Sequence, residues 1–134
     1  MNAFAIRLKP QQDLKSELDQ FVRQQALMAA CIVTCVGSLT QATLRHANQP
    51  GGTVYQGHFE IVSLTGVMST NGSHYHLAIA DSTGATIGGH LLEGCLIYTT
   101  AEIVIGVLPQ LRFEREYDET TGFKELAIYP CSFS

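Results

Sequence analysis

The feature that most constrains this chain is a histidine-bearing stretch from residue 74 to residue 90 with the pattern of a β-hairpin. An alternating run, HYHLAIA, leads into the turn sequence DSTG, and a second run, ATIGGH, follows it. Strand side chains two positions apart lie on the same face, so His74 and His76 are expected to point the same way. The stretch therefore predicts two antiparallel strands with two histidines on one face of the first.

The length of the turn decides where the third histidine, His90, points. A two-residue turn would place His90 opposite Tyr75, on the other face of the hairpin. A three-residue turn ends in a residue with left-handed backbone, and Gly84 stands where a glycine is then favoured. With that turn His90 lies directly across from His76, and the three imidazoles converge.

Three convergent imidazoles with a fourth position open are the ligand set of a catalytic type of zinc site, whereas structural zinc sites are closed by four protein ligands. Imidazole suits zinc first, with nickel, copper and iron as further divalent candidates. We therefore predict zinc or another divalent transition metal bound by His74, His76 and His90, with room for a small-molecule ligand. The alternative is a set of solvated or core histidines in a strand.

Length and composition predict one domain over residues 1–134, in which charged residues are only 15% and apolar residues 46%. So little charge covers a monomer's surface poorly, which favours an oligomer. The apolar run at 101–108 is a candidate for part of the interface, with sheet core as its alternative. No signal peptide or membrane-spanning run is recognised, and the four cysteines are expected to be thiols, so we expect a cytoplasmic protein without membrane contact.

Apolar alternation predicts strands over residues 3–8, 31–36, 39–47, 57–64, 96–108, 111–117 and 123–129, besides the hairpin. Gly37 and Gly66 are expected at a strand end and at a bend. One amphipathic helix is expected after Asp13 as N-cap, because apolar residues then recur every three to four positions. Many strands with one main helix predict an α/β (α+β) fold, a single compact domain with a mixed, largely antiparallel sheet.

Direct binding to duplex DNA is not favoured by the charges of this chain. The net charge is −4, and the eight basic residues are spread along the sequence without a run. Non-specific DNA affinity comes mainly from lysine and arginine neutralising phosphates. We therefore predict weak or no duplex binding by the isolated protein, with any DNA role arising through a partner.

Several stretches together resemble the plants and prokaryotes conserved (PPC) domain: Arg7-Leu8-x-Pro10, Gly37-Ser38 with Ala42-x-Leu44-Arg45, residues 57–64, the three-histidine hairpin, and residues 120–123. The resemblance covers nearly the whole chain, and the hairpin is its most specific part. It implies a stand-alone bacterial or archaeal α/β domain that assembles as a homotrimer, has the three histidines as its metal site, and belongs to a family usually labelled DNA-binding or regulatory. This chain differs at His58 and Val62 from a motif that plant members use to bind partners, and its sequence has no AT-hook.

The fold and its three-histidine zinc site are also similar to α-acetolactate decarboxylase, whose metal has a nearby glutamate. Glu60, in an otherwise apolar strand, is the candidate for that catalytic role, and its alternatives are pairing with Arg45 or meeting solvent. Two functions therefore stay open. One is a non-enzymatic DNA-associated or regulatory trimer. The other is a metal-dependent enzyme, decarboxylase- or hydrolase-like, acting on a small carbonyl compound, in which Glu60 moves a proton.

Overall fold

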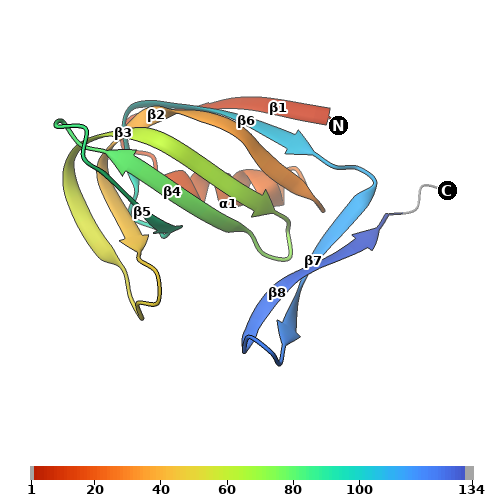
Figure 1. Cartoon of the computed structure of the whole chain (residues 1–134). Helices are drawn as coiled ribbons and strands as arrows, with labels where there is room; N and C mark the ends of the chain where they lie inside the picture. The colour runs from red at the N-terminus through yellow and green to blue at the C-terminus, as the bar shows by residue number, and fades with distance from the viewer. Residues whose placement is uncertain (1, 132–134) are drawn as a thin grey trace.

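A six-stranded antiparallel sheet dominates the computed structural model, which describes residues 2–131 (Figure 1). The elements are β1 (Asn2–Leu8), α1 (Leu14–Gln24), β2 (Ala30–Arg45), β3 (Thr53–Met68), β4 (His74–Ala80), β5 (Thr86–Leu91), β6 (Leu96–Val107), β7 (Leu111–Asp118) and β8 (Phe123–Pro130). The strand order is β1-β6-β2-β3-β4-β5, and the end of β2 also pairs with β5, so the sheet curls on itself. Mostly antiparallel sheet with one helix in a single domain is the predicted fold class, and it is confirmed.

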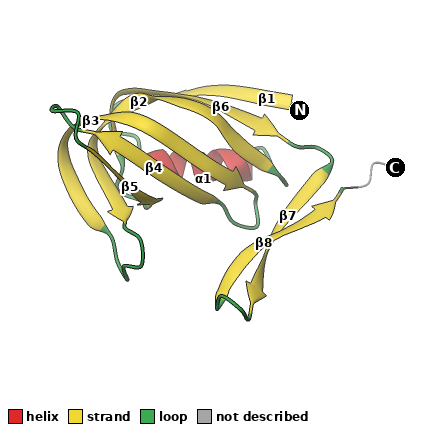
Figure 2. Ribbon diagram, viewed as in Figure 1, coloured by secondary structure: helices red, strands yellow, loops and turns green. Residues whose placement is uncertain are grey.

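The helix α1 packs its apolar side against one face of the sheet (Figure 2). Asp13 is its N-cap as predicted, because its carboxylate accepts a hydrogen bond from the Ser16 N–H at 3.0 Å. Leu14, Leu18 and Val22 are fully buried, and burial of each contributes about 1.5–3 kcal/mol to folding. Within residues 2–131, no helix combines the length and apolar character that a membrane crossing requires.

Two glycines that were expected to interrupt strands lie inside them instead, so the predicted strand limits are corrected there. β2 continues through Gly37, where a side-chain Cβ would lie 2.3 Å from the Thr100 carbonyl oxygen of β6. β3 continues through Gly66, where the Tyr75 ring of β4 occupies the space that a Cβ would need. Both glycines allow close approach between neighbouring strands, which is a different use of glycine from ending a strand.

The run at 101–108 lies almost entirely in β6, which has β1 on one side and β2 on the other. Ala101, Ile103 and Ile105 are buried in the core. The sheet-core alternative is therefore right for these inward-facing residues, and only the opposite face of β6 is left to meet another molecule.

The last two strands, β7 and β8, form a separate two-stranded sheet that extends away from the rest of the molecule (Figure 1). We call residues 111–130 the C-terminal arm. Its base is fixed by Phe113, which is buried and whose N–H donates to the Met28 carbonyl at 2.9 Å. The Phe113 carbonyl accepts hydrogen bonds from the Ser69 hydroxyl and the Asn71 side-chain amide. The burial of Phe113 and these hydrogen bonds fix the base of the arm to the domain.

Candidate metal centre

The turn between β4 and β5 has the predicted three-residue form. The Asp81 N–H donates to the Ala85 carbonyl at 2.9 Å, and Gly84 has the expected left-handed backbone with φ 86°. Asp81 also accepts hydrogen bonds from the Thr83 N–H and hydroxyl, and this lowers the pKa of its carboxyl. With this turn, His76 and His90 are direct partners across the two strands, so the predicted register is confirmed.

The three imidazoles come together on one face of the hairpin. One ring nitrogen from each of His74, His76 and His90 lies within 4.8 Å of the others, and the His74 Nε2 to His90 Nδ1 distance is 3.3 Å. Zinc bound tetrahedrally at 2.0–2.1 Å holds its ligand nitrogens about 3.3 Å apart. The His74–His90 spacing matches this value, the His76 nitrogen lies within 4.8 Å of both, and three imidazoles are donors that suit a single divalent ion.

The electrostatics keep two of these imidazoles, those of His74 and His90, in the form that binds metals. Burial is the main cause that lowers the pKa of His74, followed by the neighbouring His76 and by Arg115 of the arm. Burial is also the main cause that lowers the pKa of His90, and the nearby positive charge of Arg45 is the second cause. A lowered pKa favours neutral imidazole, which is the state with a free lone pair for a metal.

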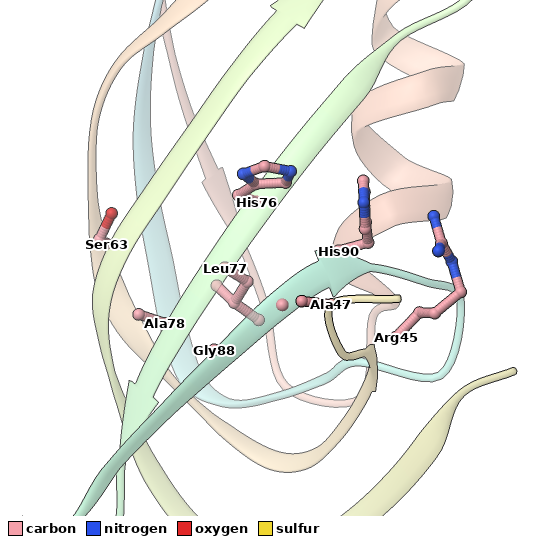
Figure 3. Close-up of a pocket in the computed structure, with 9 residues that line it drawn as sticks. Arg45, Ala47, Ser63, His76, Leu77, Ala78, Gly88 and His90 are labelled. Atoms are coloured by element: carbon pink, nitrogen blue, oxygen red, sulfur yellow. The ribbon is translucent and has the colours of Figure 1, made fainter. Parts of the chain in front are cut away.

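A depression of about 320 Å³ adjoins two of the imidazoles, His76 and His90 (Figure 3). It is lined further by Arg45, Ala47, Ser63, Leu77, Ala78, Gly88 and Gly89. Arg45 reaches this place because the end of β2 pairs with β5, with Arg45 directly opposite His90. Sequence reasoning did not place Arg45 at the metal site, since nothing local in the sequence indicates the pairing of β2 with β5.

Glu60 lies on β3 opposite Ala80, four residues along β4 from His76. At about 3.3 Å per residue this separates the two positions by about 13 Å. The Glu60 side chain is exposed, although the sequence argument for its role assumed burial. Within one chain the structure does not bring Glu60 together with the three imidazoles.

A family model described as the Plants and Prokaryotes Conserved (PCC) domain matches residues 1–109. The chain belongs to the PCC domain family. PCC and PPC are two abbreviations of the same plants and prokaryotes conserved domain, which is the family that the sequence motifs indicated. The match includes the three-histidine hairpin and ends before the C-terminal arm, so the arm lies outside the part of the PCC domain that the family model describes.

Among curated relatives, this PCC domain is 49% identical over 132 residues to the bifunctional protein GlmU of a Synechococcus strain, covering 98% of the chain and 21% of GlmU. It is 28% identical over 110 residues to the AT-hook motif nuclear-localized protein 8 of Arabidopsis thaliana, covering 75% of the chain and 28% of that protein. The chain thus spans between a fifth and a third of the length of these relatives. In these two relatives the matching segment is one part of a longer protein.

Among solved structures, a hypothetical protein from Salmonella enterica is 44% identical, with a TM-score of 0.95 over 96% of this chain and 94% of that one. The metal-containing protein AF0104 of Archaeoglobus fulgidus is 24% identical, with a TM-score of 0.76 over 95% and 94% of the two chains. A Ralstonia eutropha protein, provisionally named DNA-binding, is also 24% identical, with a TM-score of 0.78 over 92% and 89%. The two more distant structures share the PCC fold.

Proposed function

We propose that this PCC domain is a metal-binding protein that holds zinc, or another divalent transition metal, with His74, His76 and His90, and that it works as a homotrimer. The observation that carries the metal proposal is the 3.3 Å spacing of the His74 and His90 ring nitrogens, with His76 beside them. The name of the archaeal neighbour, a metal-containing protein, adds support from the same fold. When bound, such an ion supplies a Lewis acid beside the pocket.

The direct test is elemental analysis of protein purified without a metal-affinity tag. One divalent ion per chain is the expected result, because each chain carries a complete set of three imidazoles. Protein that stays free of metal after dialysis against zinc and removal of excess zinc would contradict the proposal.

Metal retention should extend to pH values below the ordinary histidine pKa of about 6.5. Protons compete with the metal for the ring nitrogens, and the lowered pKa of His74 and of His90 moves this competition to lower pH. The metal is then lost as the pH falls through these lowered values. Equilibrium dialysis at a series of pH values, followed by elemental analysis, measures the midpoint. Half of the metal lost at pH 7 or above would oppose this expectation.

Metal-dependent catalysis on a small carbonyl compound needs a group that moves a proton near the ion. Glu60 was the candidate, and its position about 13 Å along the strand from His76 leaves it out of reach within one chain. The geometry therefore favours binding of a metal and a small ligand over the enzymatic alternative.

A role at DNA is the second candidate, because relatives and neighbours carry AT-hook and DNA-binding names. Direct binding is opposed by charge, since three chains of −4 each carry −12. Two of the eight cations are also engaged: Lys15 pairs with Asp19 at 2.7 Å, and Arg112 pairs with Glu114. We therefore propose that any such role acts through a partner protein.

Fluorescence anisotropy with a random duplex should show little or no binding at physiological salt. A protein whose lysines and arginines contact six to ten phosphates would instead lose affinity for the duplex by roughly 10³-fold or more between 50 and 200 mM salt. Submicromolar binding with that salt dependence would refute the partner proposal and would make direct DNA binding the function to pursue.

The homotrimer proposal is supported by the C-terminal arm, because an isolated two-stranded hairpin is at best marginally stable in water. Strand pairing places Tyr117, Leu126 and Ile128 on one face of the arm, together with the basic Arg115 and Lys124. Tyr117 and Ile128 are 66% and 59% exposed, so this face is largely uncovered within one chain. The opposite face carries most of the arm's acidic residues.

A second copy of the chain offers a complementary surface on the sheet face that points away from α1. Val36 and Glu102 are direct partners on β2 and β6, and both are exposed. Val62 and Glu60 are exposed on the neighbouring β3. Apolar side chains and carboxylates on this face match the apolar and basic groups of the arm. We propose that the arm of one subunit packs on this face of the next.

A further inference from the structure

The pocket beside the candidate metal centre has a second cationic group, Arg45, next to the imidazoles. Arg45 and His90 are direct partners on adjacent strands, so their side chains leave the sheet on the same face. Figure 3 shows the Arg45 guanidinium beside the His90 ring, with His76 on the other side of that ring. Any ion held by the three histidines would therefore have a guanidinium as its neighbour.

Glycine at position 89 is needed for this arrangement. A Cβ at Gly89 would lie 2.7 Å from the Arg45 carbonyl oxygen, and a Cβ at Gly88 would lie 2.9 Å from the Leu77 carbonyl oxygen. Both distances are shorter than real Cβ contacts allow, so a side chain at either position would push β5 away from its neighbours. Gly89 therefore lets β5 lie close to Arg45 of β2, and Gly88 lets it lie close to Leu77 of β4, and both glycines line the pocket.

The guanidinium of Arg45 has unused hydrogen-bonding capacity. It has five N–H donors, and its one hydrogen bond to the described part of the chain, residues 2–131, is a long contact of 3.4 Å from Nη1 to the Gln49 carbonyl. No carboxylate lies within ion-pair distance of Arg45 among residues 2–131. A half-buried arginine beside a metal cation is electrostatically unfavourable unless an anion lies between the two.

We propose that the pocket binds a small organic carboxylate, with one oxygen on the open position of the metal and with Arg45 holding the carboxylate by its paired N–H groups. This inference rests on the proposed metal site and names the class of ligand that the site takes. The planar fork of arginine matches a carboxylate with two parallel hydrogen bonds. Leu77, Ala78 and Ala47 line the rest of the pocket, so they suit a short apolar tail. The volume of about 320 Å³ limits the ligand to a small molecule.

The test uses the whole chain loaded with cobalt(II), whose visible absorption changes when its fourth ligand changes. Propionate is the probe, and propionamide, of nearly the same shape without the charge, is the control ligand. Propionate should alter the spectrum at far lower concentration than propionamide. Arg45→Gln should weaken propionate binding by at least about 10-fold, the usual loss for a charge-assisted hydrogen bond, and Arg45→Lys should recover part of it. Arg23→Gln, on the exposed side of α1, is the matched control and should bind propionate normally.

Cobalt content separates this inference from the metal proposal. Arg45→Gln should keep its cobalt, because the arginine repels the ion and contributes no ligand. Equal propionate affinity in wild type and Arg45→Gln, both loaded with cobalt, would overturn the carboxylate site and leave the metal site intact. Tighter binding of inorganic phosphate than of propionate would overturn the choice of a carboxylate. Wild-type protein that takes up no cobalt would overturn the metal proposal itself, and this inference with it.

Discussion

Replacing His76 with alanine is expected to abolish stoichiometric metal binding while the fold stays intact. His76 is two residues from His74 and directly opposite His90, so its removal leaves two imidazoles without their common neighbour. Four-ligand zinc sites bind with about 10–16 kcal/mol, so one ligand contributes on the order of 3 kcal/mol and its loss weakens binding by roughly 10²-fold or more. The side chain is exposed, so little packing is lost.

Elemental analysis after dialysis measures the metal, and circular dichroism measures the fold. His58→Ala is the matched control, because His58 is also an exposed strand histidine but lies against Tyr98, with ring centroids 4.7 Å apart, and outside the three-histidine cluster. This control should keep its metal. Metal content in His76→Ala equal to that of wild type would contradict the proposed ligand set.

The hairpin that carries the histidines was predictable because its geometry is local. Gly84 selects the turn, the turn fixes the register, and the register places His90 opposite His76. The helix start at Asp13 was predictable for the same reason, since a capping side chain bonds to a backbone N–H three residues away.

Features that depend on long-range strand pairing were not predictable in this way. The pairing of β2 with β5 brings Arg45 to the site from a strand 45 positions earlier than His90. The continuation of β2 through Gly37 depends on contact with Thr100, which is far away in sequence. The position of Glu60 depends on a register shift between β3 and β4 near residue 62. Sequence alternation carries no information about such partners.

The second large effect is expected from the C-terminal arm. The double variant Leu126→Asp and Ile128→Asp should convert the proposed trimer to monomers, because it puts two carboxylates on the apolar face of the arm and against the exposed Glu60 and Glu102 of the next subunit. The two apolar side chains would be buried only in the proposed interface between subunits. Losing both costs about 4 kcal/mol at each interface, which is roughly a 10³-fold weaker association.

Multi-angle light scattering at micromolar concentration measures the mass. Neither residue is buried within one chain, so the variant monomer should keep its strand content and its metal. Val54→Asp, at an exposed position near the start of β3, is the control and should remain trimeric because Val54 lies outside both proposed contact surfaces. A wild-type protein that is monomeric at this concentration would refute the trimer. A trimeric double variant would instead refute the arm as its interface, because two added carboxylates cannot be buried there without a strong loss of affinity.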